Sequence, residues 1–215
     1  MESVYSLKNN PIVRKIFMTM LFPTILMNLT TAIGSMADAV IIGQYLDDLS
    51  LSVVTFATPI YMVINTLAAL FAVGGCIAMS IEAGKGDKKE ANRAFSLSME
   101  FLVLTGVLLF MAGLFFSNII TKWLGAGEDI FEQVRVYSQI ILLGGPIFVL
   151  NIAIAFFVRN DGRPNLAMAG MFTSIFVDII LNVVFVGVMK MGVDGAAYST
   201  VIGQLVSMIV ISSHF

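Results

Sequence analysis

Charged residues are scarce in this chain, at 12% of its residues, about half the share found in an ordinary soluble domain. Cysteine and histidine each occur only once, which excludes a disulfide framework and any zinc site built from Cys and His pairs. The sequence also lacks a basic block, a nucleotide-binding loop, a catalytic triad and an HExxH motif. We therefore expect no nucleic-acid partner, no enzymatic activity and no bound cofactor.

Apolar residues dominate instead, at 58% of the 215 residues, with 17 Phe and 14 Met among them. A soluble fold of this length has too little interior to bury so much hydrocarbon. A lipid bilayer removes that limit, because apolar side chains can then face outward. The composition therefore predicts an integral membrane protein with the bilayer as its main partner.

Six stretches are long enough to cross a membrane, since a helix rising 1.5 Å per residue needs about 20 residues for a core of about 30 Å. The predicted spans cover residues 16–42, 52–81, 94–121, 136–158, 165–188 and 195–213. No short alternating segments indicate a membrane barrel. Pro23, Pro59 and Pro146 fall inside spans, where each removes a backbone hydrogen bond and permits a kink. The predicted fold is all-α, one six-helix transmembrane bundle over residues 1–215.

The distribution of cations predicts the orientation of these spans. One side carries nine Lys and Arg residues, namely Lys8, Arg14, Lys15, Lys85, Lys88, Lys89, Arg93, Arg159 and Arg163. The other side carries three, which are Lys122, Arg135 and Lys190. By the positive-inside rule, we expect a multi-pass protein of the cell membrane with both termini in the cytoplasm. Because the sequence stops directly after the sixth span, we also expect it to be a truncation or one half of something larger.

Asp178 is the sharpest candidate site residue, because a carboxylate inside a span costs about 2.5–3.5 kcal/mol. Counted from Asn165, it lies about 20 Å into the fifth span, near the midplane. Ser174 and Asn182, four residues to either side, share its helix face. This stripe could be a patch of interhelical hydrogen bonds. The carboxylate favours a functional site, since neutral amides suffice for packing and a carboxylate can also exchange a proton.

Asp38 is the second acidic candidate, about 35 Å along the first span from Lys15 and close to the outer boundary. It could be an interface residue or a hydrogen-bonded structural group, but apolar residues continue after it, which favours a functional role. Thr200 lies about 8 Å below the outer end of the sixth span. Asp38, Asp178, Asn182 and Thr200 thus fall in the outer half of the bilayer and could converge. Their oxygen atoms suit either Na⁺ or a proton, and their spacing does not distinguish the two.

Several stretches resemble the multidrug and toxic compound extrusion (MATE) family. They are FPTILMNLTTAIGSMADAVIIGQYL in the first span, RNDGRPNLAM between the fourth and fifth spans, FVDIILNVVFV in the fifth, and MGVDGAAYSTVIGQ leading into the sixth. The resemblance covers essentially the whole chain and implies the N-terminal six-helix lobe of a twelve-helix fold. That fold has two lobes related by a pseudo-twofold axis around a V-shaped cavity.

The resemblance also implies roles for individual residues. Asp38 matches an acidic first-helix position linked to cation coupling, and Asp178 with Asn182 matches a fifth-helix Asn and Asp pair. Thr200 matches a sixth-helix hydroxyl near that site, and Asn151 matches a polar fourth-helix position close to it. Here Asp precedes Asn in the fifth helix, whereas some relatives have the reverse order. That difference leaves the coupling ion, H⁺ or Na⁺, open.

The function that the resemblance implies is a cation-coupled antiporter that exports organic, often cationic, drugs. Such transport needs a second six-helix lobe or a partner half, which this chain lacks. One alternative is a lipid-linked saccharide flippase of the same superfamily, but such proteins usually place several cations in the cavity. No Lys or Arg lies deep in any predicted span here. A further alternative is a membrane fragment that does not transport.

Overall fold

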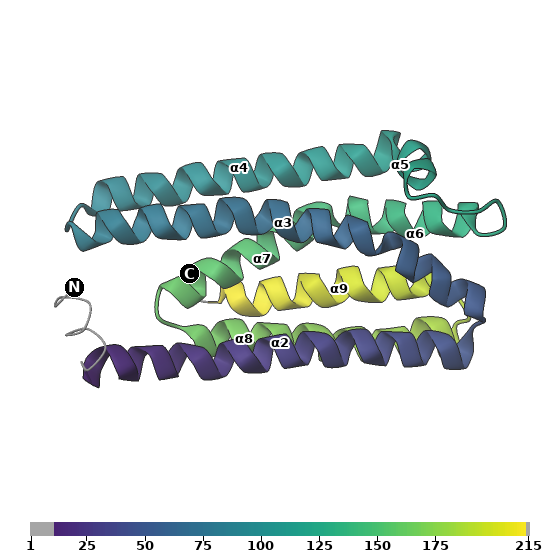
Figure 1. Cartoon of the computed structure of the whole chain (residues 1–215), viewed down its shortest axis with the longest axis horizontal. Helices are drawn as coiled ribbons and strands as arrows, with labels where there is room; N and C mark the ends of the chain where they lie inside the picture. The colour runs from purple at the N-terminus through teal and green to yellow at the C-terminus, as the bar shows by residue number, and fades with distance from the viewer. Residues whose placement is uncertain (1–10, 214–215) are drawn as a thin grey trace, which may run out of the picture.

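Long antiparallel helices make up the computed structural model, which describes residues 11–213 (Figure 1). The described residues contain no strand. The elements are α2 (Pro11–Tyr45), α3 (Asp48–Gly84), α4 (Lys88–Phe115), α5 (Ser117–Trp123), α6 (Phe131–Leu143), α7 (Gly145–Asn160), α8 (Pro164–Asn182), η1 (Val183–Val188) and α9 (Val193–Ser212). The architecture confirms the predicted all-α bundle of membrane-length helices.

Five helical stretches are each long and apolar enough to cross a membrane, and a bent pair provides the sixth. That pair is α6 and α7, which meet at an angle of 49°. The bend follows Gly144, where Gly145 and Pro146 begin α7 and Pro146 cannot donate a backbone hydrogen bond. Pro23 and Pro59, in contrast, lie inside the uninterrupted helices α2 and α3. Of the three prolines inside predicted spans, only Pro146 stands at a helix break.

The third helix ends earlier than the predicted span of residues 94–121. Helix α4 ends at Phe115, and the separate short helix α5 begins at Ser117. Between them Phe116 leaves the helical conformation, with φ −118° and ψ 6°. No proline or charged residue lies within four residues of Phe116, and the nearest glycine is Gly113. The hydroxyl residues Ser117 and Thr121 of α5 are nevertheless buried, so packing rather than local propensity directs this turn.

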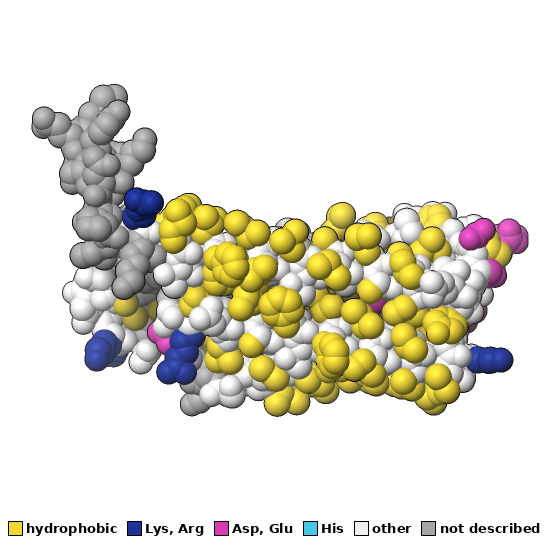
Figure 2. All heavy atoms as spheres, turned by 90° about the horizontal axis from the view of Figure 1, so that it is seen from below, with side chains coloured by type: hydrophobic (Ala, Val, Ile, Leu, Met, Phe, Trp, Pro, Cys, Tyr) yellow, Lys and Arg dark blue, Asp and Glu magenta, His cyan; other side chains and the backbone are white. Residues whose placement is uncertain are grey.

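The outer surface carries a broad belt of exposed apolar side chains between two polar ends (Figure 2). Its members include Phe22, Ile33, Leu70, Leu108 and Phe176, which are all more than half exposed. An apolar surface this large would drive aggregation in water, whereas lipid tails cover it without penalty. The belt fits the membrane environment that the composition predicts.

The two ends of the bundle differ in charge. One end, here called the basic end, holds Arg14, Lys85, Lys88, Lys89, Arg93, Arg159 and Arg163. The other, here called the acidic end, holds the α2–α3 turn with Asp47 and Asp48 and the α4–α6 connection with Glu128 and Asp129. Lys8, which the sequence also assigns to the basic side, lies outside the described residues. This asymmetry underlies the orientation predicted above.

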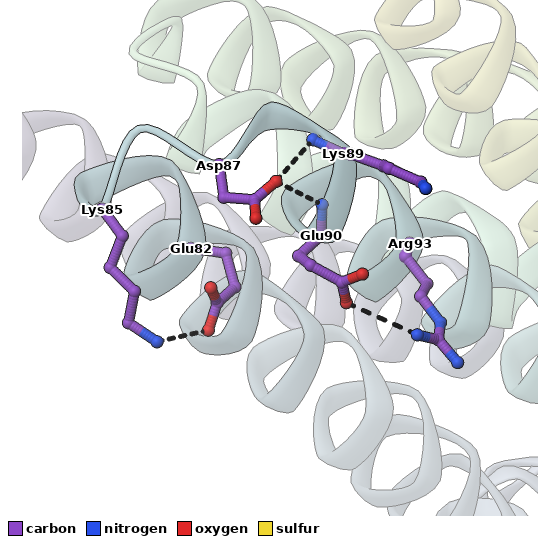
Figure 3. Close-up of polar contacts among 6 residues, drawn as sticks. All are labelled: Glu82, Lys85, Asp87, Lys89, Glu90 and Arg93. Atoms are coloured by element: carbon purple, nitrogen blue, oxygen red, sulfur yellow. Dashed lines mark hydrogen bonds and ion pairs between the residues drawn. The ribbon is translucent and has the colours of Figure 1, made fainter.

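The α3–α4 turn at the basic end is held by local polar contacts (Figure 3). Asp87 caps α4 by accepting hydrogen bonds from the backbone N–H groups of Lys89 and Glu90, each 3.1 Å long. Lys85 pairs with Glu82 at 2.7 Å, and Arg93 lies 3.6 Å from Glu90. The carboxylates of Glu82 and Glu90 are thus already paired within this turn.

The α2–α3 turn at the acidic end depends on one carboxylate. Asp47 caps α3 by accepting hydrogen bonds from the Ser50 backbone N–H at 3.0 Å and the Ser50 hydroxyl at 2.6 Å. These hydrogen bonds lower the pKa of Asp47, because they favour its ionised form. This cap defines where α3 begins, close to the end of α2.

Replacing Asp47 with Ala should lower the melting temperature of the detergent-purified protein, because an N-terminal backbone donor of α3 loses its partner. Asp47→Asn, which still accepts a hydrogen bond, is the matched control and should retain most of the stability. Since a lowered pKa stabilises the fold only while the group is ionised, the advantage of Asp over Ala should persist above pH of about 4 and shrink below it. An equal difference at pH 7 and pH 3 would contradict this role.

Candidate functional site

Asp38 and Asn182 join α2 to α8. The Asn182 amide donates a hydrogen bond of 2.9 Å to the Asp38 carboxylate, between residues 144 positions apart in the chain. Asn182 is completely buried and Asp38 is half-buried. The two residues therefore form an interhelical contact with little access to water, in which each keeps further hydrogen-bonding capacity.

Asp178 lies one helical turn before Asn182, with 8% of its surface exposed. The hydroxyls of Ser199 and Thr200 on α9 lie near its carboxylate, which is also within electrostatic range of Asp38. The Thr200 hydroxyl donates to the Ala196 carbonyl at 2.9 Å. Side chains from α2, α8 and α9 thus meet around two carboxylates, as the sequence predicts for this group.

Gly203 sets how closely α9 approaches this site. A Cβ atom at position 203 would lie 2.8 Å from the Ser174 carbonyl oxygen and 3.2 Å from the Asp178 Cβ. It would also lie 3.4 Å from the Ser174 hydroxyl. Only glycine leaves room for these contacts, so Ser174 and Asp178 pack directly on the α9 backbone. Ser174 therefore lines the α8–α9 contact.

Asn151 connects α7 to the same face of α9. Its amide donates a hydrogen bond of 2.5 Å to the Gln204 side chain, and only 7% of Asn151 is exposed. Gln204 lies four residues after Thr200 and thus on the same side of α9. Asn151 is therefore bound to α9 one helical turn beyond Thr200. Its partner, Gln204, cannot be identified from the spacing of residues in the sequence.

Two tyrosines complete the polar cluster. The hydroxyls of Tyr61 on α3 and Tyr137 on α6 lie 3.2 Å apart, at hydrogen-bonding distance. Both lie within electrostatic range of Asp38 and Asp178. Tyr137 is buried, and the Tyr61 ring packs edge-on against Phe148, with 5.8 Å between ring centroids. The positions of Tyr61 and Tyr137 in the sequence do not indicate that they lie near the aspartates. Their proximity results from the packing of α3 and α6.

Three acceptor oxygens in this region are buried without a hydrogen-bond partner among the described residues. They are Oδ1 of Asp178, Oδ1 of Asn182 and Oδ1 of Asn151. Buried acceptors are normally satisfied by a donor or a cation. Oxygen ligands of this kind suit a hard cation, and the carboxylate equally suits a proton. Across residues 11–213, no group of three His, Cys, Asp or Glu residues could hold a metal ion by itself.

Helix α8 changes its geometry directly after Asn182. At Asn182 the α-helix α8 gives way to the π-helix η1, whose wider turns run to Val188. Such π segments are rare and often mark functional sites. Gly187 of η1 also packs beside the Tyr45 ring at the end of α2, where a Cβ would lie 3.1 Å from the ring. The segment beyond Asn182 thus fits closely against α2.

The close α8–α9 contact can be tested with Gly203→Ala, which places a methyl group against the Ser174 carbonyl. Overpacking of this kind costs about 1–3 kcal/mol, so the melting temperature of the purified protein should fall by several degrees. The matched control is Gly74→Ala in α3, where a Cβ meets nothing within 4 Å. Equal melting temperatures for Gly203→Ala and the wild type would show that α8 and α9 do not approach this closely.

Comparisons with known proteins show which family and which relatives this chain resembles. The MatE family model matches residues 23–184, which include Asp38, Asn151, Ser174, Asp178 and Asn182. The chain is 26% identical to the multidrug export protein MepA of Staphylococcus saprophyticus over 193 residues, which cover 90% of this chain and 43% of that protein.

Two solved structures share the fold of the chain. One is a MOP superfamily transporter from Pyrococcus furiosus, for which a binding pocket of reversed polarity suggests a different function. The other is the outward-facing conformation of a multidrug resistance MATE family transporter. Each has a TM-score of 0.86 and 26% identity, over 96% of this chain and 45% of the other. The chain thus spans less than half the length of the relatives that it matches.

Proposed function

The chain belongs to the MatE family, and from this premise we propose that it forms one lobe of a cation-coupled antiporter that exports organic, often cationic, drugs. Members of this family are transporters and not enzymes. The relatives named multidrug export protein MepA support the proposed substrate class. The coupling ion in the proposal is H⁺ or Na⁺.

One observation carries this proposal: two carboxylates meet inside the bundle, with acceptor oxygens of Asp178 and Asn182 left without a donor. Charges within a membrane are costly and usually mark ion or proton pathways. A bound cation or proton would offset the negative charge of Asp38 and Asp178 and satisfy those oxygens. Thr200 and Ser199 could contribute hydroxyl oxygens to the same site.

The proposed mechanism uses this change in charge to shift a conformational equilibrium. The Asp38–Asn182 hydrogen bond links α2 to α8, so a cation competing for the carboxylate alters the contact between these helices. A ligand shifts such an equilibrium only by the difference between its affinities for the two states. In the proposal, the cation binds the outward-open state more tightly, and the drug leaves as the cation enters.

The transporter in this proposal contains a second six-helix lobe, either from the same polypeptide or from a partner half. The matched relatives are about twice as long as this chain, which supports that requirement. The proposed orientation has both termini in the cytoplasm, so the basic end of the bundle faces inward. It rests on the positive-inside distribution of Lys and Arg.

A lipid-linked saccharide flippase is the alternative within the same superfamily. Such a protein needs cations in its cavity to hold a pyrophosphate group. Among the described residues, the site is surrounded by Asp38, Asp178 and neutral polar side chains. This negative environment favours a cationic or neutral substrate.

The proposal predicts that Asp178→Asn abolishes ion-driven drug efflux while membrane insertion stays normal. The variant keeps the shape of the side chain but can neither bind a proton at that atom nor hold Na⁺ by charge. Dye efflux from vesicles containing the assembled transporter, under separate Na⁺ and pH gradients, measures the effect. The gradient that drives wild-type efflux also identifies the coupling ion.

Asp48→Asn is the matched control, because it removes one carboxylate at the same end of the bundle from an exposed position. It should leave efflux at the wild-type rate. Wild-type efflux in the Asp178→Asn protein would contradict the proposed site. An equal loss in both variants would attribute the effect to general surface charge.

A further inference from the structure

The π-helix η1 lets two residues contact α2 that an α-helix would turn to different faces. Asn182 donates to Asp38, and Gly187 packs against the ring of Tyr45. Asp38 and Tyr45 are seven residues apart, which in α2 brings them within about 20° of the same face. Asn182 and Gly187 are five residues apart, which in an α-helix would place them about 140° apart. An α-helix through residues 182–187 could therefore make one of these contacts but not both.

The wider turn of η1 removes this mismatch. The Met189 N–H donates to the Val184 carbonyl at 2.8 Å, five residues back instead of the four of an α-helix. One turn thus holds an additional residue, and Gly187 returns to the face that Asn182 occupies. The segment therefore has the geometry of an α-helix with one residue inserted, and its two contacts with α2 hold it in that form.

The residues of η1 have a weak intrinsic preference for the α-helix. Its sequence VVFVGV consists of four valines, one phenylalanine and one glycine, which all form helices less readily than alanine or leucine. Directly after η1, Lys190 and Gly192 have positive φ angles of 53° and 68°, so the turn into α9 does not continue the helix. That turn can take up a change of one residue without shifting the register of α9.

The start of α9 also packs on η1. A Cβ atom at Gly195 would lie 3.0 Å from the Phe185 Cβ, so the α9 backbone lies directly against this segment. Gly195 precedes Ser199 by four residues, which places it one helical turn before the hydroxyls near Asp178. A change of turn in η1 would therefore act on α9 as well as on α2.

We propose that η1 switches between a π-helix and an α-helix according to the state of Asp38. While Asn182 donates to Asp38, both contacts with α2 hold η1 in the π form. When a cation takes over the carboxylate and this hydrogen bond is released, η1 relaxes to an α-helix and Gly187 turns away from Tyr45. The end of α2 then separates from η1. This inference rests on the proposed cation site and adds the element that moves.

Deletion of Val184 tests whether η1 contains one inserted residue. The deletion leaves Asn182 and Gly187 four residues apart, on one face of an ordinary α-helix, so both contacts with α2 persist without a π turn. The variant should insert normally and melt at or above the temperature of the wild type. A lower melting temperature by several degrees would overturn the proposal.

The matched control is deletion of Phe176, another exposed apolar residue of the same span. It turns Asp178 and Asn182 by about 100° relative to Ser174 and should lower the melting temperature by several degrees. Equal damage from the two deletions would overturn the proposal, because η1 would then tolerate the loss of a residue no better than α8 does.

The distance between two spin labels in the assembled transporter tests the switch itself. The labels are attached to Leu29→Cys on α2 and Val188→Cys on η1, which both replace exposed side chains. Cys76→Ser removes the single native cysteine of the chain. The distance between the labels then reports how η1 lies against α2.

Asp38→Ala removes the acceptor of the Asn182 hydrogen bond and should shift this distance by several ångströms. In the protein that also lacks Val184, the same substitution should leave the distance unchanged, because no π turn remains to relax. Asp48→Ala is the matched control, since it removes an exposed carboxylate at the same end of the bundle, and it should cause no shift. Asn182→Ala removes the donor of the same bond and should reproduce the shift if Asp38→Ala folds poorly.

An unchanged distance in both Asp38→Ala and Asn182→Ala would overturn the switch. An equal shift with and without Val184 would also overturn it, because the movement would then not need the π turn. Neither measurement involves transport. Failure of the switch is thus distinct from failure of the proposed function, which the efflux of the Asp178→Asn protein decides.

Discussion

The hydrogen bond from Asn182 to Asp38 is the interaction on which this architecture depends, because it places a carboxylate between two helices with little access to water. A charge in that position cannot be left unpaired without a large cost. It therefore constrains the rotation of α2 and α8 about their axes, so that these two residues face each other. Once α8 is oriented in this way, Asp178 and Ser174 point toward α9, since they lie on the same helix face as Asn182.

The contact between α8 and α9 then follows from small side chains. Gly203 admits the Ser174 carbonyl and the Asp178 side chain, and this close approach brings Ser199 and Thr200 to the carboxylate. Helix α9 extends the polar face to α7 through Gln204 and Asn151. The site therefore needs helices from both ends of the sequence, which explains why it lies where α2, α8 and α9 pack together.

The sequence predicts the membrane-length helices, because uninterrupted apolar runs and the clustering of Lys and Arg depend only on local composition. It also identifies Asp38, Asp178 and Asn182, since a polar side chain within a long apolar run needs a partner. The break at Phe116 has no local signal, and the partners Gln204, Tyr61 and Tyr137 cannot be read from spacing. These features depend on how neighbouring helices rotate and approach, which in turn depends on contacts such as that at Gly203.

A double-mutant cycle with Asp38→Ala and Asn182→Ala, measured as unfolding free energy in detergent with and without the coupling cation, tests the central claim most directly. Without the cation, the two residues should show a coupling of about 0.6 kcal/mol, the average for polar contacts between membrane helices, and at most about 1.7 kcal/mol. With the cation bound, the coupling should become smaller, because the carboxylate then shares its charge with the ion. Additive effects within about 0.3 kcal/mol under both conditions would show that the Asp38–Asn182 bond does not join α2 to α8, and would contradict the account.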